Sequence, residues 1–290
     1  MRLAIASGKG GTGKTTVAVN LALYLQELAQ EVSLLDCDVE EPNVQYFLKV
    51  QWAEETAQTV PVPRIDTTKC QGQNCKYCVQ ECRFKALIWM VDSVLVFPEL
   101  CHGCGLCMYL CPEEAIQETT REIGLLRWGR CNGLLVHGGI LRIGEAMAPP
   151  LISRVLESAP GTEIQIADSP PGTSCPLLET VRGSDYTILV AEPTPFGVHD
   201  FRITAQVLQK MQKPFGVVIN RDGMGDDQLD NLLKQEKIPV LARLPYSPDA
   251  ARSYSRGEAL IHSVPGFKEL YRNLWENLLG RLQERNTSAP

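Results

Sequence analysis

The sequence has no apolar run long enough to cross a bilayer, and its first residues show no signal-peptide pattern. It also has no lysine/arginine tract, and its net charge at neutral pH is −6. Binding to nucleic acid without sequence preference requires a basic surface, so no nucleic-acid partner is expected. A membrane partner is not expected either, and the predicted location is the cytoplasm.

Cysteine, by contrast, is abundant. The chain has eleven cysteines, and eight of them lie between Cys70 and Cys111. Thiols stay reduced in the cytoplasm, so clustered cysteines there predict metal ligands rather than disulfides. A chain of 290 residues can form one large core, or a core and a small additional module.

A glycine-rich stretch, SGKGGTGKTT at residues 7–16, follows a short apolar segment and precedes an apolar-periodic one. A strand, a glycine loop and a helix in this order are the context of a phosphate-binding P-loop. Its backbone N–H groups and the helix N-terminus attract phosphate oxygens. Lys14 is expected to reach the β- and γ-phosphates, and the Thr15 hydroxyl to bind Mg²⁺. The predicted binding set is Gly8, Gly10, Gly11, Thr12, Gly13, Lys14, Thr15 and Thr16.

Aspartates end two of the expected strands. Residues 32–38 read as a buried strand with Asp36 and Asp38 at its end, and residues 163–168 as another that ends in Asp168. In a doubly wound sheet, functional groups gather at the carboxyl ends of parallel strands. We therefore expect these aspartates near the phosphates, with Asp168 holding a water on Mg²⁺. Aspartates after a strand can also merely cap a helix. Cys37, between them, is expected to be a small buried residue.

Further buried strands are expected at residues 186–191, 215–220 and 240–245. The predicted fold is a doubly wound, mostly parallel α/β sheet with helices on both faces. Near the C-terminus, apolar residues from Phe267 to Leu282 recur at helical spacing. The other face of that helix mixes acidic and basic residues, so we expect it to pack on the core rather than bind a membrane.

The eight clustered cysteines form two runs. The first is Cys70-x4-Cys75-x2-Cys78-x3-Cys82, and the second is Cys101-x2-Cys104-x2-Cys107-x3-Cys111-Pro112. The second run has the spacing of a bacterial ferredoxin, in which three close cysteines bind one cluster and the fourth binds the other. Two 4Fe-4S clusters are predicted. Cluster A would take Cys70, Cys75, Cys78 and Cys111, and cluster B would take Cys101, Cys104, Cys107 and Cys82.

The first run departs from the ferredoxin pattern. Two extra residues follow Cys70, and Arg83 stands where a proline would follow the fourth cysteine. The spacing therefore supports Cys70 less than the other ligands, and cluster A is expected to be the more labile. Zinc is the alternative metal, because four-cysteine zinc sites also use closely spaced pairs. Two three-cysteine runs with a Cys-Pro step fit iron–sulfur better. Residues 94–96 are expected to form a hairpin strand.

Lys9, the early lysine of the glycine loop, narrows the class. The loop resembles the deviant Walker A motif of the MinD/ParA/nitrogenase-iron-protein superfamily, and the chain is similar to its Mrp-type iron–sulfur ATPases. The resemblance implies a homodimer that encloses two nucleotides, with Lys9 crossing to the partner's phosphates. It also implies that Asp38 orients the attacking water, that Asp36 supports the loop or the Mg²⁺ shell, and that the N–H of Gly172 faces the γ-phosphate.

The same resemblance assigns the base pocket. Asn220 and Arg221 resemble the family's adenine-reading pair, and Pro245 would lie near the base. The guanine-reading Asn-Lys-x-Asp pattern is absent, which favours ATP over GTP. A dicluster ferredoxin-like module of α+β type would be inserted into the ATPase core. The expected limits are residues 1–62 for the first part of the core, 63–118 for the insert and 119–290 for the second part, with Pro61 and Pro63 at the boundary.

The implied function is an ATPase that uses Mg²⁺ and two 4Fe-4S clusters. ATP would close the dimer through Lys9, and hydrolysis with Asp38 and Asp168 would reopen it, gating electron transfer or cluster maturation toward a redox or client protein. A positional organiser with redox-sensing clusters is the alternative. An amidoligase would need a glutaminase domain for which the chain has no room. Cys175, paired with Cys131, could hold an interfacial cluster, but a packed or near-site cysteine is favoured.

Overall fold

The computed structural model describes residues 1–159 and 161–288, without the side chains of residues 286–288. The chain divides into two compact units. Unit 1 comprises Met1–Glu55, Leu126–Ile140 and Ile152–Pro290, and unit 2 comprises Thr56–Leu125 and Leu141–Leu151. Each unit is described by itself.

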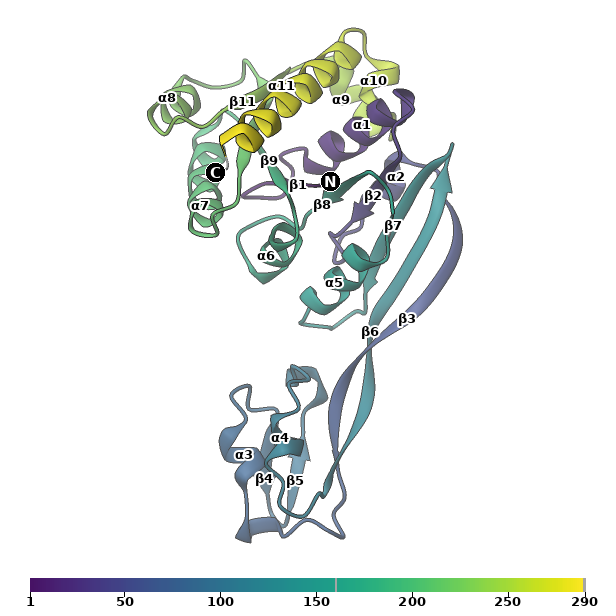
Figure 1. Cartoon of the computed structure of the whole chain (residues 1–290), viewed down its shortest axis with the longest axis vertical. Coiled ribbons are helices and arrows are strands. Elements are labelled where there is room, and N and C mark those ends of the chain that lie inside the picture. The colour runs from purple at the N-terminus through teal and green to yellow at the C-terminus, as the bar shows by residue number, and fades with distance from the viewer. Residues whose placement is uncertain (160, 289–290) are drawn as a thin grey trace. The chain divides into compact units, whose positions relative to one another are not determined.

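Unit 1 is built on a mostly parallel sheet, as the sequence predicts (Figure 1). The strand order is β11-β10-β9-β1-β8-β2-β7-β6-β3, and the six neighbouring pairs from β11 to β7 are parallel. The strands are β1 (Arg2–Ala6), β2 (Val32–Asp36), β7 (Leu134–Leu141), β8 (Ile164–Asp168), β9 (Tyr186–Ala191), β10 (Phe215–Asp222) and β11 (Val240–Pro245).

Helices cover both faces of this sheet. On β1, Leu3 and Ile5 pack into one hydrophobic cluster, and Ala4 and Ala6 pack into the other, because successive strand residues face opposite sides. The first cluster includes α1 (Lys14–Glu27), α2 (Val44–Phe47), α10 (Leu260–Ser263) and α11 (Phe267–Ser288). The second includes α6 (Cys175–Arg182), α7 (Pro195–Lys210) and α8 (Gln228–Gln235). The remaining helices that reach unit 1 are α5 (Pro149–Glu157) and α9 (Pro248–Ser255).

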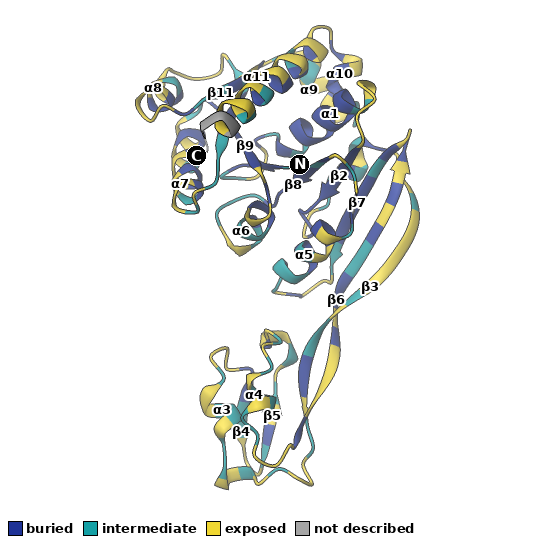
Figure 2. Cartoon of the chain, in the orientation of Figure 1, coloured by how far each residue is buried: buried dark blue, intermediate teal, exposed yellow. Residues whose placement is uncertain are grey.

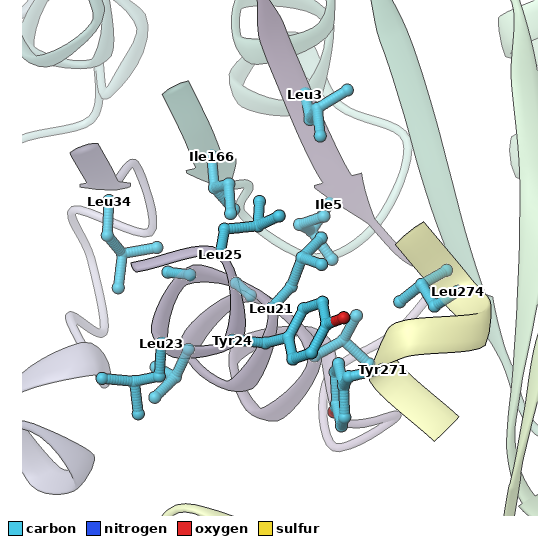
Figure 3. Packing of buried hydrophobic residues seen from close by; sticks show 14 of the residues in the cluster. Leu3, Ile5, Leu21, Leu23, Tyr24, Leu25, Leu34, Ile166, Tyr271 and Leu274 are labelled. Carbon is cyan, nitrogen blue, oxygen red and sulfur yellow. The ribbon is translucent and has the colours of Figure 1, made fainter. Parts of the chain in front are cut away.

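The C-terminal helix packs as predicted. Tyr271, Leu274 and Leu278 of α11 are fully buried, and they lie in the cluster that holds α1 and β1. Figure 3 shows Tyr271 and Leu274 in this cluster. The apolar stripe of this helix is thereby used within the core. No helix among the described residues is both long and apolar enough to cross a membrane.

Two long strands differ from the sequence prediction. Pro61 and Pro63 were expected to mark a boundary, but both lie within β3 (Gln51–Ile65), a continuous strand at the edge of the sheet. It pairs with β6 (Ile116–Cys131), and both strands run from unit 1 into unit 2. Most of β3 is exposed (Figure 2), so its sequence needs no apolar alternation. An edge strand also tolerates Pro61 and Pro63, because backbone positions that face away from the sheet donate no N–H to a neighbouring strand.

Strand β6 turns directly into β7. Asn132 and Gly133 connect the two strands, with φ values of 47° and 90°. Two successive left-handed residues are typical of a type I′ turn, for which Asn-Gly is the preferred pair. The Asn-Gly step was the sequence signal for this hairpin, and the sequence prediction did not use it.

Unit 2 contains short elements between β3 and β6. They are the 3₁₀ turn η1 (Gly72–Asn74), α3 (Tyr77–Glu81), β4 (Leu87–Met90), β5 (Ser93–Val96), the 3₁₀ turn η2 (Pro98–Leu100) and α4 (Leu106–Tyr109). Strands β4 and β5 form an antiparallel hairpin, which confirms the strand expected at residues 94–96. The insert limits of 63 and 118 stay a prediction.

Candidate functional site

The glycine loop connects the carboxyl end of β1 to the first residue of α1. Strand β1 lies between β8 and β9, so functional groups from three strand ends meet there. Gly11 and Gly13 have φ values of 77° and 94°, which side chains rarely allow. A Cβ on Gly8 would lie 2.4 Å from the Asp200 carbonyl oxygen, so this close approach also requires glycine.

Protein donors hold the carbonyl groups of the loop. The Ser7 hydroxyl donates to the Lys9 carbonyl at 2.7 Å, and the Asn220 amide donates to the Thr12 carbonyl at 2.7 Å. The Arg221 guanidinium donates to the Gly11 carbonyl at 3.4 Å. With these carbonyls engaged, the N–H groups of the loop remain the groups that can bind an anion.

Three aspartates meet behind the loop, as the strand ends predict. Asp36 of β2 and Asp168 of β8 are directly paired in the sheet register. The Thr15 hydroxyl donates to Asp168 Oδ2 at 2.5 Å. Burial raises the pKa of Asp168 to about 6 although Lys14 lowers it, and burial raises the pKa of Asp38 to about 7. Burial, and then the charge of Asp168, raises the pKa of Asp36.

The Thr15 hydroxyl and the Asp168 carboxylate, which are in contact, are oxygen donors of the kind that suits a divalent cation. Asp36 Oδ1 and Asp168 Oδ1 are buried and have no hydrogen-bond partner among the described residues. Carboxylate and hydroxyl oxygens are the ligands that Mg²⁺ prefers, and a cation would offset the repulsion between the carboxylates. Thr15 and Asp168 are in contact, so the two predicted Mg²⁺ ligands lie together.

Lys9 and Arg221 share a partner that the sequence prediction missed. Glu192, directly after β9, is buried and lies 3.4 Å from Lys9 Nζ. The same carboxylate is 2.5 Å from Arg221 Nη1. An acidic residue at the end of a central parallel strand was the available signal. In the free protein, therefore, Glu192 holds both cations beside the loop.

A cavity of about 620 Å³ opens over the loop, which is within the usual range for small-ligand pockets. Its wall includes Asn220, Arg221 and Pro245, which were predicted to surround the base. The Asn220 amide contacts the loop carbonyl in this structure, so reading a base would require it to turn. The N–H of Gly172 donates to the Ser7 carbonyl at 3.0 Å, and this bond would have to open for a phosphate contact. The predicted residues that line the cavity are Gly10, Gly11, Gly13, Lys14, Thr15, Thr16, Asp38, Asn220, Arg221 and Pro245.

The clustered cysteines lie in unit 2 around two cavities. A small cavity of about 20 Å³ is lined by Cys70, Cys75, Cys78 and Cys111. A larger cavity of about 190 Å³ is lined by Cys82, Cys101, Cys104 and Cys107, and Cys78 also reaches it. All eight are free thiols. Nowhere among the described residues do three histidine, cysteine or acidic side chains come together closely enough to hold a metal ion.

The other three cysteines differ in exposure. Cys37 is fully buried, as predicted, and burial raises its pKa well above the ordinary value. Cys131 packs in the hydrophobic cluster of α1, whereas Cys175 at the start of α6 is exposed. Cys131 is therefore a core residue of unit 1.

Comparisons with known proteins agree with this geometry. The family model described as the CobQ/CobB/MinD/ParA nucleotide binding domain (CbiA) matches residues 3–261. An uncharacterized protein of Methanocaldococcus jannaschii is 30% identical over 90% of this chain and 91% of its own. An iron-sulfur cluster carrier protein of Pyrococcus horikoshii is 24% identical over 98% of this chain and 87% of its own.

Among solved structures, the septum site-determining protein MinD of Pyrococcus horikoshii, complexed with Mg-ADP, has the same fold. It aligns with a TM-score of 0.61 and 19% identity, over 96% of this chain and 95% of that one. The glycine loop, the aspartates at the strand ends and the family match agree: this chain belongs to the CobQ/CobB/MinD/ParA nucleotide-binding family and has the P-loop ATPase fold of MinD.

Proposed function

We propose that the protein is an ATP-hydrolysing iron–sulfur protein that acts as a homodimer. Unit 1 binds Mg²⁺ and ATP, and unit 2 binds two 4Fe-4S clusters. ATP binding closes the dimer through Lys9, and this closure gates electron transfer from the clusters, or cluster delivery, to a redox or client protein. Hydrolysis, with Asp38 and Asp168 at the phosphates, reopens the dimer.

The observation that carries the proposal is the division of the cysteines between the two cavities. One cavity is lined by the four cysteines assigned to cluster A, and the other by the four assigned to cluster B together with Cys78. In each set, one member comes from the other run: Cys111 joins the first set and Cys82 joins the second. This exchange of the fourth ligand is typical of two-cluster ferredoxins.

The backbone of unit 2 supports the same assignment by repeating itself. Each run has a left-handed residue directly after its second cysteine, Lys76 in the first run and Gly105 in the second. A short helix follows each of them, α3 and α4. A second left-handed residue lies three positions after the last cysteine of each run, Lys85 and Glu114. The runs therefore share one local fold, as expected of a duplicated cluster-binding motif.

The donor set also fits iron–sulfur clusters chemically. Burial and the neighbouring thiols raise the pKa of Cys78 to about 11, so the Cys78 thiol resists ionising beside the others. Bound iron would stabilise the thiolates and supply one-electron chemistry. The name of the P. horikoshii relative, an iron-sulfur cluster carrier protein, supports cluster transfer as one of the two outputs.

In the nucleotide site, each residue has a proposed task. Lys14 binds the β- and γ-phosphates, and Thr15 and Asp168 bind Mg²⁺ or its water. Asp38 lies close enough to Lys14 and Asp168 for their charges to change its pKa, which supports a position beside the terminal phosphate where it would orient a water. Asn220, Arg221 and Pro245 surround the adenine, and Gly172 changes its bond to Ser7 for one to the γ-phosphate.

The test is anaerobic EPR of the dithionite-reduced protein with and without Mg²⁺ and ATP, together with iron and sulfide analysis. About eight irons per chain and two interacting cluster signals are expected. The Cys107→Ser variant should lose the signal of cluster B, whereas Cys175→Ser, the matched control outside both runs, should keep both clusters. Zinc in place of iron, or equal iron loss in both variants, would contradict the proposal. Two clusters that do not respond to ATP would contradict the gating step alone.

A further inference from the structure

Arg127 on β6 is a buried cation in unit 1 that has no role in the proposed nucleotide site or the cysteine sites. Its guanidinium lies over the Trp52 ring of β3, 4.0 Å from the ring centre. Its Nη2 donates to the Gln45 side-chain oxygen of α2 at 3.1 Å. Arg127 thus connects the two long strands, β3 and β6, with the short helix α2.

The burial of Arg127 is only partly compensated. Arg127 is 6% exposed, and its Nε has no hydrogen-bond partner among the described residues. None of the ion pairs found among those residues includes it. Burying a guanidinium is costly unless hydrogen bonds and a counter-charge offset the lost hydration. Burial accordingly lowers the pKa of Arg127, and the charges of Asp36 and Glu55 act in the opposite direction.

Asp36 has an unpaired acceptor atom that complements the unpaired Nε donor of Arg127. Its Oδ1 is buried and has no hydrogen-bond partner among the described residues, while its Oδ2 accepts the N–H of Val44 at 3.2 Å. Asp36 and Arg127 approach the same point of the sheet from two strands. A Cβ on Gly138 of β7 would lie 3.4 Å from the Asp36 Cβ and 4.0 Å from Arg127 Nε. The missing side chain of Gly138 leaves the space between the carboxylate and the guanidinium open.

Both Asp36 and Arg127 form a hydrogen bond with helix α2. Asp36 binds the backbone of Val44, the first residue of α2, and Arg127 binds the side chain of Gln45, the second. A cation bound by the aspartates at the P-loop would neutralise part of the charge that attracts Arg127. The contacts of Arg127 with α2 and with Trp52 therefore have different energies in the free and the nucleotide-bound protein, which is the condition for a change of conformation.

We infer that Arg127 is a positioning residue that couples the nucleotide state of the P-loop site to strands β3 and β6. These strands continue from unit 1 into unit 2, where the cysteine runs lie between them. Loading the aspartates would weaken the electrostatic attraction between Asp36 and Arg127 and thereby change the contacts of Arg127 with Gln45 and Trp52. The inference rests on the proposed nucleotide site, and it does not depend on the proposed clusters.

Hydrogen–deuterium exchange of the full chain, with and without Mg²⁺ and ATP, tests the coupling. In the wild type, peptides within residues 7–16 should be protected, and peptides from β3 and β6 should change their exchange rate several-fold. The Arg127→Met variant should keep the P-loop protection and lose the change in β3 and β6. Arg130→Met is the matched control, because Arg130 is exposed on the same strand and, within the part of the chain that the structure describes, hydrogen-bonds only to the nearby Gly133 carbonyl. It should behave as the wild type.

Two results would overturn the inference: β3 and β6 that do not respond in the wild type while the P-loop does, or an Arg127→Met variant that keeps their response. Should that variant fail to fold, Trp52→Leu removes the stacking surface from an only partly buried residue and should give the same selective loss. A P-loop that ATP does not protect would remove the proposed nucleotide site and this inference with it. EPR decides separately on the clusters, so their absence would contradict the proposed function without affecting the exchange result.

Discussion

The nucleotide site and the cysteine sites are assembled to different degrees in the same chain. At the P-loop, backbone geometry and hydrogen bonds already hold Thr15 against Asp168 and Asn220 against the loop. In unit 2, the cysteines line two cavities, but no three of them gather as metal ligands among the residues that the structure describes. A P-loop is fixed by a strand, a turn and a helix, whereas thiolates repel one another and gather as their metal binds. Unit 1 is thus organised by packing, and unit 2 is expected to be organised by its cargo or cofactor.

The largest effects are expected from two substitutions, one in the P-loop and one in a cysteine run, each of which should impair its own site and spare the other. Lys14→Ala should reduce ATP hydrolysis by roughly 100-fold or more, because a preorganised charge at the phosphates is lost. It should leave the iron content unchanged. Cys78→Ser should do the reverse, with loss of cluster A and nearly normal nucleotide binding. Activity, calorimetric ATP binding and iron analysis of both variants measure this; loss of iron in Lys14→Ala would show that the regions are not independent.

Removing iron should have a large but local effect. Chelation of the reconstituted protein should increase proteolytic cleavage within residues 66–115, since metal binding and local folding are linked. Cleavage within unit 1 should stay the same, because its hydrophobic clusters are large and continuous. Limited proteolysis followed by mass spectrometry reads both regions at once. Equal protection of unit 2 with and without iron would mean that its fold is as preformed as the P-loop.

The sequence predicted the fold around the P-loop where local signals are strong and missed features whose signals are weak, and the two-cluster module stays a prediction. The P-loop, the buried strands and the cysteine spacing are strong local signals, because each requires particular residues at fixed positions. Strand β3 was missed, since an exposed edge strand such as residues 51–63 needs no apolar pattern. Glu192 and Arg127 were missed because their partners are distant in sequence: Lys9 and Arg221 for one, Trp52 and Gln45 for the other.

A moderate effect is expected at Glu192. The Glu192→Gln change removes a buried negative charge beside the phosphate site and frees Lys9 and Arg221 for the nucleotide. The affinity for Mg²⁺ and ATP should rise about three- to tenfold, which corresponds to roughly 1 kcal/mol. Isothermal titration calorimetry measures it, and Glu179→Gln, which breaks a more exposed local pair with Arg182, is the control. Weaker binding would mean that Glu192 positions the loop and that its charge does not oppose the phosphates.

The last effect is confined to acid pH: it concerns the stability of unit 1 and involves His137 on β7. His137 is buried, its Nδ1 is 2.9 Å from the Ser158 hydroxyl, and burial lowers its pKa to about 4. The unfolded chain, with a histidine pKa near 6.5, therefore binds more protons between about pH 4 and 6.5. The stabilising effect of the neutral imidazole is complete above pH 6.5 and is lost as the pH falls toward 4.

His137→Gln should therefore flatten part of the acid dependence of unfolding. Between pH 7.5 and 5.0, the wild type should lose up to about 2 kcal/mol more than the variant. Urea unfolding followed by helical circular dichroism reports mainly on unit 1, because its long helices α1, α7 and α11 lie there. His199→Gln, at an exposed position of α7, should follow the wild type. An equal acid dependence of wild type and His137→Gln would show that the buried imidazole gains a counter-charge on protonation. The preformed region would then adapt to charge as the cysteine region is expected to adapt to metal.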